Sequence, residues 1–229
     1  MGVDRFVDSA WLESGLTAIA SAIRVKTGGV DLLSFPNGFI DAINSITVGE
    51  GGETTSRAAG LYETGTNTLV NSWDELVSSG YVTDANGVLQ KGAEQQQFYE
   101  LTGDLVLPDG SVAIDNDCFS NCELTCVVLP NTIEFIGEYA FSRCYSLKSI
   151  AIPEGVTDIK RNTFSNCKAL ESIVLPKTLQ SVAQQAFFNA AINGLQVYYR
   201  GTIAMYQNIS IGNYNDPLQN ATKTYDYVG

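Results

Sequence analysis

Residues 105–130, LVLPDGSVAIDNDCFSNCELTCVVLP, contain two copies of one pattern, an apolar triplet closed by a proline. The pattern occurs at Leu105–Pro108 and Val127–Pro130 and returns at Ile150–Pro153 and Ile173–Pro176, so the prolines lie 22, 23 and 23 residues apart. Two further columns keep this spacing: Phe119, Phe141, Phe164 and Phe187, and Ile114, Ile136, Ile159 and Val182. Three kinds of position share one register, which identifies an internal repeat.

A repeat of just over 20 residues is too small to bury its own apolar face and is stable only when stacked on copies of itself. Each copy is therefore predicted to form one coil of a solenoid. The triplet is predicted to be a strand, with its first and third residues inward and its middle residue outward. The phenylalanine column is predicted to anchor the turn that leads into the next coil.

The repeat resembles a known family. Its central copies read VVLPNTIEFIGEYAFSRCYSLKSIAIPEGV at residues 127–156 and IKRNTFSNCKALESIVLP at residues 159–176, and they resemble the BspA-type leucine-rich repeat. The start, ESGLTAIASAIRVKTGGVDLLSFPNGFIDAINSI at residues 13–46, is similar to a helical module in tail proteins of phages and prophages of Gram-positive bacteria. Residues 59–80 and 197–228 are similar to segments that precede and close such repeats.

Together, the resemblance and the periodicity predict an α+β chain: a short N-terminal helical hairpin, then a BspA-type solenoid of about four coils with caps at both ends. The predicted segments are a helical attachment or oligomerisation module (1–48), a Gly- and Thr-rich linker (49–58), a small α/β N-terminal cap (59–102), the solenoid (103–200) and a C-terminal cap (201–229). Whether residues 59–102 cover the first coil or form a separate lobe stays open.

Three local patterns refine the caps. Ser72 and Glu75 have capping-box spacing, so a short helix is predicted to begin at Ser72 and to stop at Ser79-Gly80. Trp73 is predicted to pack onto the first coil, with ligand binding as the alternative. A fifth strand is predicted at Leu195–Tyr199, followed by irregular strands that include Ile209, Ile211, Leu218 and Tyr225–Val228.

Two amphipathic helices are predicted before residue 48, one over residues 5–26 and one that begins near residues 34–36. Their apolar faces carry Leu12, Leu16, Ile19 and Ile23 in the first helix and Phe39, Ile43 and Ile46 in the second. A hairpin this short buries little area, so these faces need another surface. One possibility is that these faces fold back onto the body of the chain. The other is that they pack between copies of the chain or onto a host particle, and the resemblance favours this second possibility.

Composition limits the classes of function. The chain has 229 residues, a formal net charge of −12 and no histidine, with a pI near 4.3. An acidic chain is repelled by phosphate backbones and anionic membranes, so nucleic acid is not expected as a partner. No segment approaches 18 uninterrupted apolar residues, so membrane insertion is not expected. Histidine is the most common general acid or base at neutral pH, and no phosphate loop or nucleophile motif is present. An enzyme and a cofactor are therefore not expected.

The first residues, MGVDRFVD, have neither the basic stretch nor the apolar run of a secretory signal. The chain is thus expected to be made in the host cytoplasm and, given the resemblance, to become part of the virion as a tail or baseplate-associated protein. A bacterial cell-surface adhesin with the same repeat is the alternative. A purely structural tail component is a third possibility.

Five cysteines are present. Cys122, Cys144 and Cys167 share a repeat column with Ala190, which predicts small buried side chains that stack between coils. The competing interpretation is a metal site at Cys118-x3-Cys122-x3-Cys126. Because the spacing is not a CxxC pair and histidine is absent, no metal is expected.

The candidate binding surface is the outward column of the predicted main sheet: Val106, Val128, Ala151, Val174 and Tyr198. An apolar stripe on a sheet face open to water is unusual, because outward positions are normally polar. Either the stripe is covered by another segment, or it contacts a second copy of the chain or a protein or glycan on a host cell. Six tyrosines of the C-terminal region, Tyr198, Tyr199, Tyr206, Tyr214, Tyr225 and Tyr227, add recognition candidates, of which about two are expected to be exposed.

Overall fold

The computed structural model describes residues 47–48, 54–55, 57–93 and 101–228, which belong to two compact units, Met1–Ser56 and Arg57–Gly229. In the first unit, β1 (Thr47–Val48) pairs antiparallel with β2 (Thr54–Thr55). The boundary between the units falls inside the predicted linker. The predicted helices before residue 47 lie outside the described residues, together with all seven candidate assembly residues.

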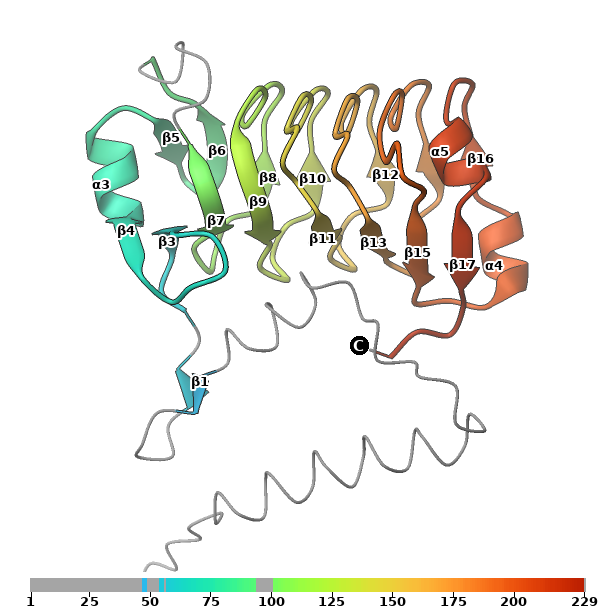
Figure 1. The fold of residues 1–229 in the computed structure, drawn as a ribbon, viewed down its shortest axis with the longest axis horizontal. Coiled ribbons are helices and arrows are strands. Elements are labelled where there is room, and N and C mark those ends of the chain that lie inside the picture. Colours follow the sequence, from blue (N-terminus) through green and yellow to red (C-terminus); the bar gives the residue numbers. More distant parts are fainter. Residues whose placement is uncertain (1–46, 49–53, 56, 94–100, 229) are drawn as a thin grey trace, which may run out of the picture. The chain divides into compact units, whose positions relative to one another are not determined.

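The second unit is a β-solenoid whose main sheet contains six parallel strands in chain order (Figure 1). These strands are β7 (Thr102–Val106), β9 (Glu123–Val128), β11 (Ser149–Ala151), β13 (Ser172–Leu175), β15 (Gln196–Tyr199) and β17 (Thr222–Thr224). Strand β15 confirms the predicted fifth strand. The predicted count of about four coils is wrong, because the stack has about six turns.

The predicted number of coils is too low in part because the last strand of the sheet does not carry the repeat pattern. Strand β17 reads Thr-Lys-Thr, and Lys223 takes the register position next to the buried Val197. The Lys223 ammonium donates to the carbonyl oxygens of Gln219 and Ala221 at 2.9 and 2.8 Å. A terminal coil has no further coil to pack against, so polar residues replace the apolar triplet.

A second row of short strands lies opposite the main sheet. Strands β6 (Val88–Lys91), β8 (Ala113–Ile114) and β10 (Phe135–Ile136) are parallel neighbours, as are β12 (Asp158–Ile159), β14 (Ser181–Val182) and β16 (Ser210–Ile211). The second residue of each short strand from β8 to β14 is buried, as the isoleucine and valine column predicts. Each coil therefore runs from the main sheet to this row and returns through the phenylalanine turn.

Residues 57–91 extend both sheets at the N-terminal end. Strand β3 (Gly60–Tyr62) pairs antiparallel with β7 and with β4 (Leu69–Ser72), while β5 (Val82–Ala85) pairs with β6. Gly103 allows the close approach of β3, because a Cβ there would lie 2.2 Å from the Tyr62 carbonyl oxygen. These strands join the solenoid and cover its first coil.

Helix α3 (Trp73–Ser78) begins as predicted. Ser72 accepts a hydrogen bond from the Glu75 backbone N–H, and the Glu75 side chain accepts one from the Ser72 N–H, which completes the capping box. Trp73 is buried in the core that continues into the first coil, and its indole N–H donates to Asp84 at 3.2 Å. The prediction that Trp73 packs on the solenoid is thereby confirmed.

The core is built from stacked identical side chains. The rings of Phe119, Phe141, Phe164 and Phe187 follow one another at centroid distances of 5.6, 5.7 and 5.4 Å, and all four are fully buried. In the triplets the first residue is buried in every strand from β7 to β15, and the third is buried in all but β9, where Leu129 is half-buried. Inward and outward positions therefore alternate as predicted.

The buried cysteines form a second ladder beside the rings. The Cys144 and Cys167 thiols donate to the carbonyl oxygens of Phe119 and Phe141, one coil back, at 3.2 and 3.1 Å. Burial raises the pKa of the Cys122 and Cys167 thiols to about 12. Thiols in this environment are packing groups and poor nucleophiles. The predicted packing role of the column is therefore confirmed.

This burial predicts selective thiol chemistry. Cys118, Cys122, Cys144 and Cys167 are buried, whereas Cys126 is half-buried. In folded protein at pH 8, a colorimetric disulfide reagent should modify at most one thiol within minutes, and all five after unfolding in guanidinium chloride, because the reagent needs an accessible thiolate. Peptide mapping should place the early label on Cys126. Rapid modification of two or more thiols in the folded protein would contradict the ladder.

The C-terminal cap differs from the predicted irregular strands. Helix α4 (Ile203–Gln207) begins after Thr202, and Leu218 lies in helix α5 (Asp216–Gln219) rather than in a strand. The cap nevertheless continues the solenoid register, because β16 pairs in parallel with β14 and β17 with β15. Helix α5 stands where the fifth coil, which begins with β15, would otherwise make its phenylalanine turn (Figure 1).

Asn215 closes the turn ladder at this end. In the preceding coils, the backbone N–H of each ring residue donates to a carbonyl oxygen of the next coil, as from Phe141 to Thr163 and from Phe164 to Ala186. At Phe187 the acceptor is the Asn215 side-chain oxygen, at 2.9 Å. The Asn215 amide group donates to Ala183 and Gly212, both at 2.9 Å. This fully buried side chain therefore substitutes for the missing coil.

Candidate binding pocket and main-sheet face

The predicted outward stripe is not continuous at the surface. Val106 and Val174 are only 8% and 6% exposed, Val128 and Tyr198 are half-buried, and Ala151 is exposed. The five residues are adjacent in register from β7 to β15, so the structure does bring them together. The accessible part of the stripe is short and centres on Val128 and Ala151.

At its N-terminal end, the face is covered by residues 57–67. Asp104 points outward from β7 and is buried, with its carboxylate 3.5 Å from the Arg57 guanidinium. The same carboxylate accepts hydrogen bonds from the Thr125 hydroxyl at 2.6 Å and the Gly65 N–H at 3.1 Å. Arg57 also donates to the Thr66 carbonyl oxygen and lies over the Tyr62 ring. A carboxylate with this many partners tolerates burial.

At the C-terminal end, the face is covered by the last residues of the chain. The Tyr227 ring lies 4.9 Å from that of Tyr198, and the Tyr227 N–H donates to the Tyr199 carbonyl oxygen at 3.0 Å. Burial raises the pKa of Tyr227 to about 12, helped by the neighbouring Tyr198. Arg200 reaches across the coils and pairs with Glu154 at 3.8 Å. Tyr198 is thus part of a packed aromatic pair.

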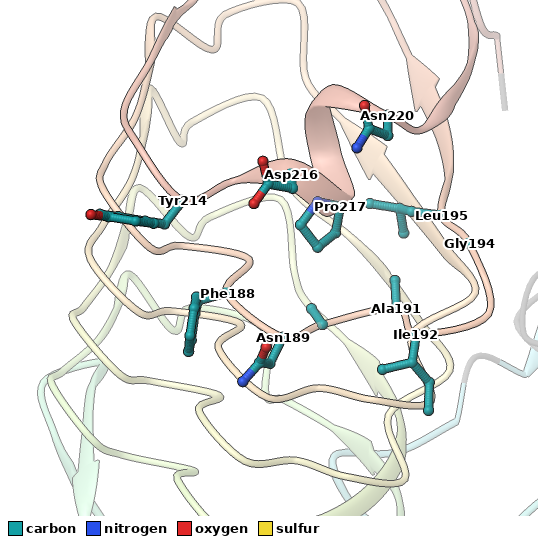
Figure 2. A pocket seen from close by; sticks show the side chains of 11 residues that line it. Phe188, Asn189, Ala191, Ile192, Gly194, Leu195, Tyr214, Asp216, Pro217 and Asn220 are labelled. Carbon is teal, nitrogen blue, oxygen red and sulfur yellow. The ribbon is translucent and has the colours of Figure 1, made fainter.

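An open pocket of about 420 Å³ lies at the C-terminal end of the turn face. It is formed by residues 188–195 of the last phenylalanine turn and residues 214–220 of the cap. Figure 2 shows Phe188, Asn189 and Ile192 along one side of the hollow and Tyr214, Asp216 and Pro217 along the other. Its volume lies within the range of about 300–1,000 Å³ that is typical of small-ligand sites.

Phe188 is exposed here because the repeat ends. Ser120, Ser142 and Ser165 occupy the equivalent position in the three preceding coils, and each is buried under the next turn. Phe188 has α5 in place of a further turn, and 37% of its surface remains exposed. The loop is also one residue longer, because Val197 follows its partner Ile173 by 24 residues, whereas Ile173 follows Ile150 by 23. Ile192 lies in this longer loop and is 67% exposed.

Tyr214 comes from the fifth coil, which begins with β15. It occupies a column in which Asp117, Tyr139, Asn162 and Gln185 also have positive φ, and its own φ is 61°. This left-handed conformation turns the chain sharply and leaves the Tyr214 ring 57% exposed beside the hollow. Of the six C-terminal tyrosines, only Tyr214 is exposed, whereas about two were expected to be. The number is lower because Tyr199, Tyr206 and Tyr225 pack edge-to-face in the cap.

Several polar groups at the pocket lack partners within the described part of the chain. The side chains of Asn189, Asp216 and Asn220 form no hydrogen bond or ion pair with another described residue. The Asn189 backbone N–H is also unpaired there, although the equivalent N–H groups of Asn121, Arg143 and Asn166 each donate to the next coil at 2.7–2.8 Å. Exposed polar groups without a partner among the described residues therefore line the same hollow as the two exposed rings.

One acid on the second row of strands has a shifted pKa. Hydrogen bonds from Ser181 and Thr157 lower the pKa of the Asp158 carboxyl, which is the opposite of the shift that a general acid needs. Within the described ranges, no group of three metal-binding side chains is close enough to hold an ion, and no helix is long and apolar enough to cross a membrane.

Sequence reasoning missed the pocket except for Tyr214. Two signals were available: a phenylalanine that interrupts a serine column, and an extra residue in the last loop. Neither shows that the following coil is replaced by a helix, and this replacement is what opens the pocket.

The comparisons with known proteins agree with the architecture. Residues 94–209 match the BspA type leucine rich repeat region in six copies, a range that includes the main-sheet strands from β7 to β15. The chain belongs to this family. The repeat of this BspA-type protein ends at Ile209, directly before the cap strand β16. A comparison with curated proteins finds no match.

Among solved structures, the BspA-type chain is similar to a leucine rich cell surface protein from Faecalibacterium prausnitzii A2-165. The two sequences are 25% identical over 56% of this chain, with a TM-score of 0.41. The matched part spans 40% of the length of that protein.

Proposed function

We propose that this BspA-type protein is a non-enzymatic recognition protein that presents a binding site on a rigid solenoid. The observation that carries the proposal is the pocket at the end of the coil stack, where two exposed aromatic rings lie beside unpaired polar groups. In the three preceding coils, the position of Phe188 is occupied by small, buried serines. Exposed aromatic residues that flank a concave site are typical of binding surfaces.

The outer face of the main sheet is a second contact surface in this proposal. Val128 and Ala151 are its accessible apolar residues, and they lie on adjacent strands between the two covered ends. A homo-oligomer built by residues 1–48 would present several copies of each surface. Linked weak sites gain effective concentration, so avidity would exceed the affinity of one site. The molar mass in solution, measured by light scattering, reports the copy number.

The setting proposed first is the bacterial cell surface, with an adhesin role. It is in line with the description of the F. prausnitzii protein, a partial likeness that does not carry the assignment alone. The second candidate is a bacteriophage tail fibre or baseplate protein, which is supported by the resemblance of residues 13–46 to a tail module. Peptide mass spectrometry separates the two: enrichment in washed cell walls supports the adhesin, and enrichment in gradient-purified particles supports the tail protein.

The recognition role is tested by binding of the full chain, fluorescently labelled, to panels of intact bacterial and epithelial cells. We expect saturable binding to at least one cell type. The double variant Phe188→Ser, Tyr214→Asn should bind at least tenfold more weakly, because the loss of one stacked ring alone corresponds to up to about tenfold. The serine restores the residue of earlier coils, and asparagine tolerates the left-handed backbone at position 214.

A matched variant on the other surface, Val128→Lys with Ala151→Lys, locates the contact. Retained binding by this variant supports the pocket as the principal site. Loss of binding only in the lysine variant, with an unchanged melting temperature, would identify the main-sheet face and contradict the pocket. Absence of saturable binding to every cell type would contradict the recognition role.

A further inference from the structure

We infer that the pocket binds an uncharged sugar residue of a glycan, held between the Tyr214 and Phe188 rings and the polar groups of Asn189, Asp216 and Asn220. This inference rests on the proposed recognition function and names its ligand class. The pocket is open on one side, so it fits the end or the edge of a larger molecule.

The apolar part of the site suits the carbon face of a sugar ring. A pyranose has one face lined by C–H groups, and such groups pack favourably against an aromatic ring with its negative face. Tyr214 and Phe188 are the two partly exposed rings at the hollow, and they come from different coils. Both rings line the same hollow, so a sugar bound there can stack on either of them.

The polar part suits hydroxyl groups. Each sugar hydroxyl is both a donor and an acceptor, whereas the Asp216 carboxylate only accepts and the Asn189 and Asn220 amides do both. The unpaired Asn189 backbone N–H adds one donor. A ligand rich in hydroxyls can satisfy all these groups together, which a purely apolar ligand cannot do.

Charge selects among hydroxyl-bearing ligands. The residues that line the pocket in the described part of the chain include one acid, Asp216, and neither lysine nor arginine. The whole chain carries a formal charge of −12. Phosphorylated and sialylated ligands would therefore meet repulsion without a compensating cation, and uncharged sugars are favoured.

The test is saturation-transfer NMR of the full chain with the methyl glycosides of galactose, glucose, N-acetylglucosamine and N-acetylgalactosamine, and with sialyllactose as the anionic comparison. We expect saturation of at least one uncharged sugar, strongest on ring C–H protons. Phe188→Ser, Tyr214→Asn and Asp216→Asn should each weaken binding by about tenfold. Tyr145→Ala removes a 38% exposed aromatic residue elsewhere on the turns and should bind as the unchanged chain does.

Three results would overturn the inference: no saturation of any uncharged sugar, equal binding by the pocket variants, or a preference for sialyllactose. Phe188→Ser keeps the test valid if Tyr214→Asn folds poorly, because serine already occupies that column in three coils. If cells bind the chain through the pocket and an excess of these sugars does not compete, the glycan inference fails while the recognition function stands. If no cell binds, the function itself fails.

Discussion

Phe164→Ala is expected to lower the free energy of unfolding by about 4 kcal/mol, since truncation of a buried phenylalanine typically costs about 3–5 kcal/mol. The ring is fully buried and stacks on Phe141 and Phe187 at 5.7 and 5.4 Å. In a solenoid, stability comes largely from contacts between neighbouring coils, and this change weakens two such interfaces. Urea unfolding followed by circular dichroism measures the loss.

Two controls test the assignment to the ring stack. Phe119→Ala should cost about 1 kcal/mol less, because its ring stacks on Phe141 alone among the described residues. Phe135→Ala removes a ring that is 41% exposed on the second row of strands and should change stability by less than about 1 kcal/mol. Equal losses for Phe164→Ala and Phe135→Ala would show that the stack does not hold the coils together.

Asn215→Ala is expected to lower the free energy of unfolding by about 3 kcal/mol. The change leaves the Phe187 N–H and the Ala183 and Gly212 carbonyl oxygens without their side-chain partner. An unsatisfied buried polar group costs about 1–3 kcal/mol, and relaxation or water entry recovers part of the sum. Hydrogen exchange should speed up at the Phe187 amide more than at the Phe141 amide, which still donates to Thr163.

Two further substitutions test whether the hydrogen bonds of the Asn215 side chain are the cause of this loss. Asn215→Asp keeps the acceptor for Phe187 but loses both donors and turns a carboxylate toward two carbonyl oxygens, so it should be at least as destabilising. Asn213→Ala, two residues away, changes an exposed side chain and should cost less than about 0.5 kcal/mol. If Asn215→Ala has the same melting temperature as the unchanged chain, the Asn215 side chain does not stabilise this end of the solenoid.

The periodic part of the chain could be predicted from the sequence. The phenylalanine and isoleucine columns, the inward first residue of each triplet and the capping box at Ser72 all describe interactions within a coil or between identical coils. The same residue types recur at every step, so the period is sufficient to show which residues face the core. The number of turns could not be predicted, because β17 lacks the apolar triplet.

The candidate site was harder to predict. Residue alternation correctly placed Val106, Val128, Ala151, Val174 and Tyr198 in one outward column. It did not show that residues 57–67 and Tyr227 cover parts of that face. These covering segments lie far away in the sequence, and the period of the repeat contains no information about them.

Sequence alone determined the coil: its length, its buried columns and its stacking on copies of itself, because the repeated unit encodes all the contacts it makes with the next unit. Tertiary structure decided where the stack ends and what the end exposes. The pocket exists because α5 replaces the fifth turn, which leaves Phe188 without the cover that its column has elsewhere. A terminal coil has one neighbouring coil fewer than an internal coil. Its surface therefore depends on contacts that occur only once in the chain, which the repeat does not encode.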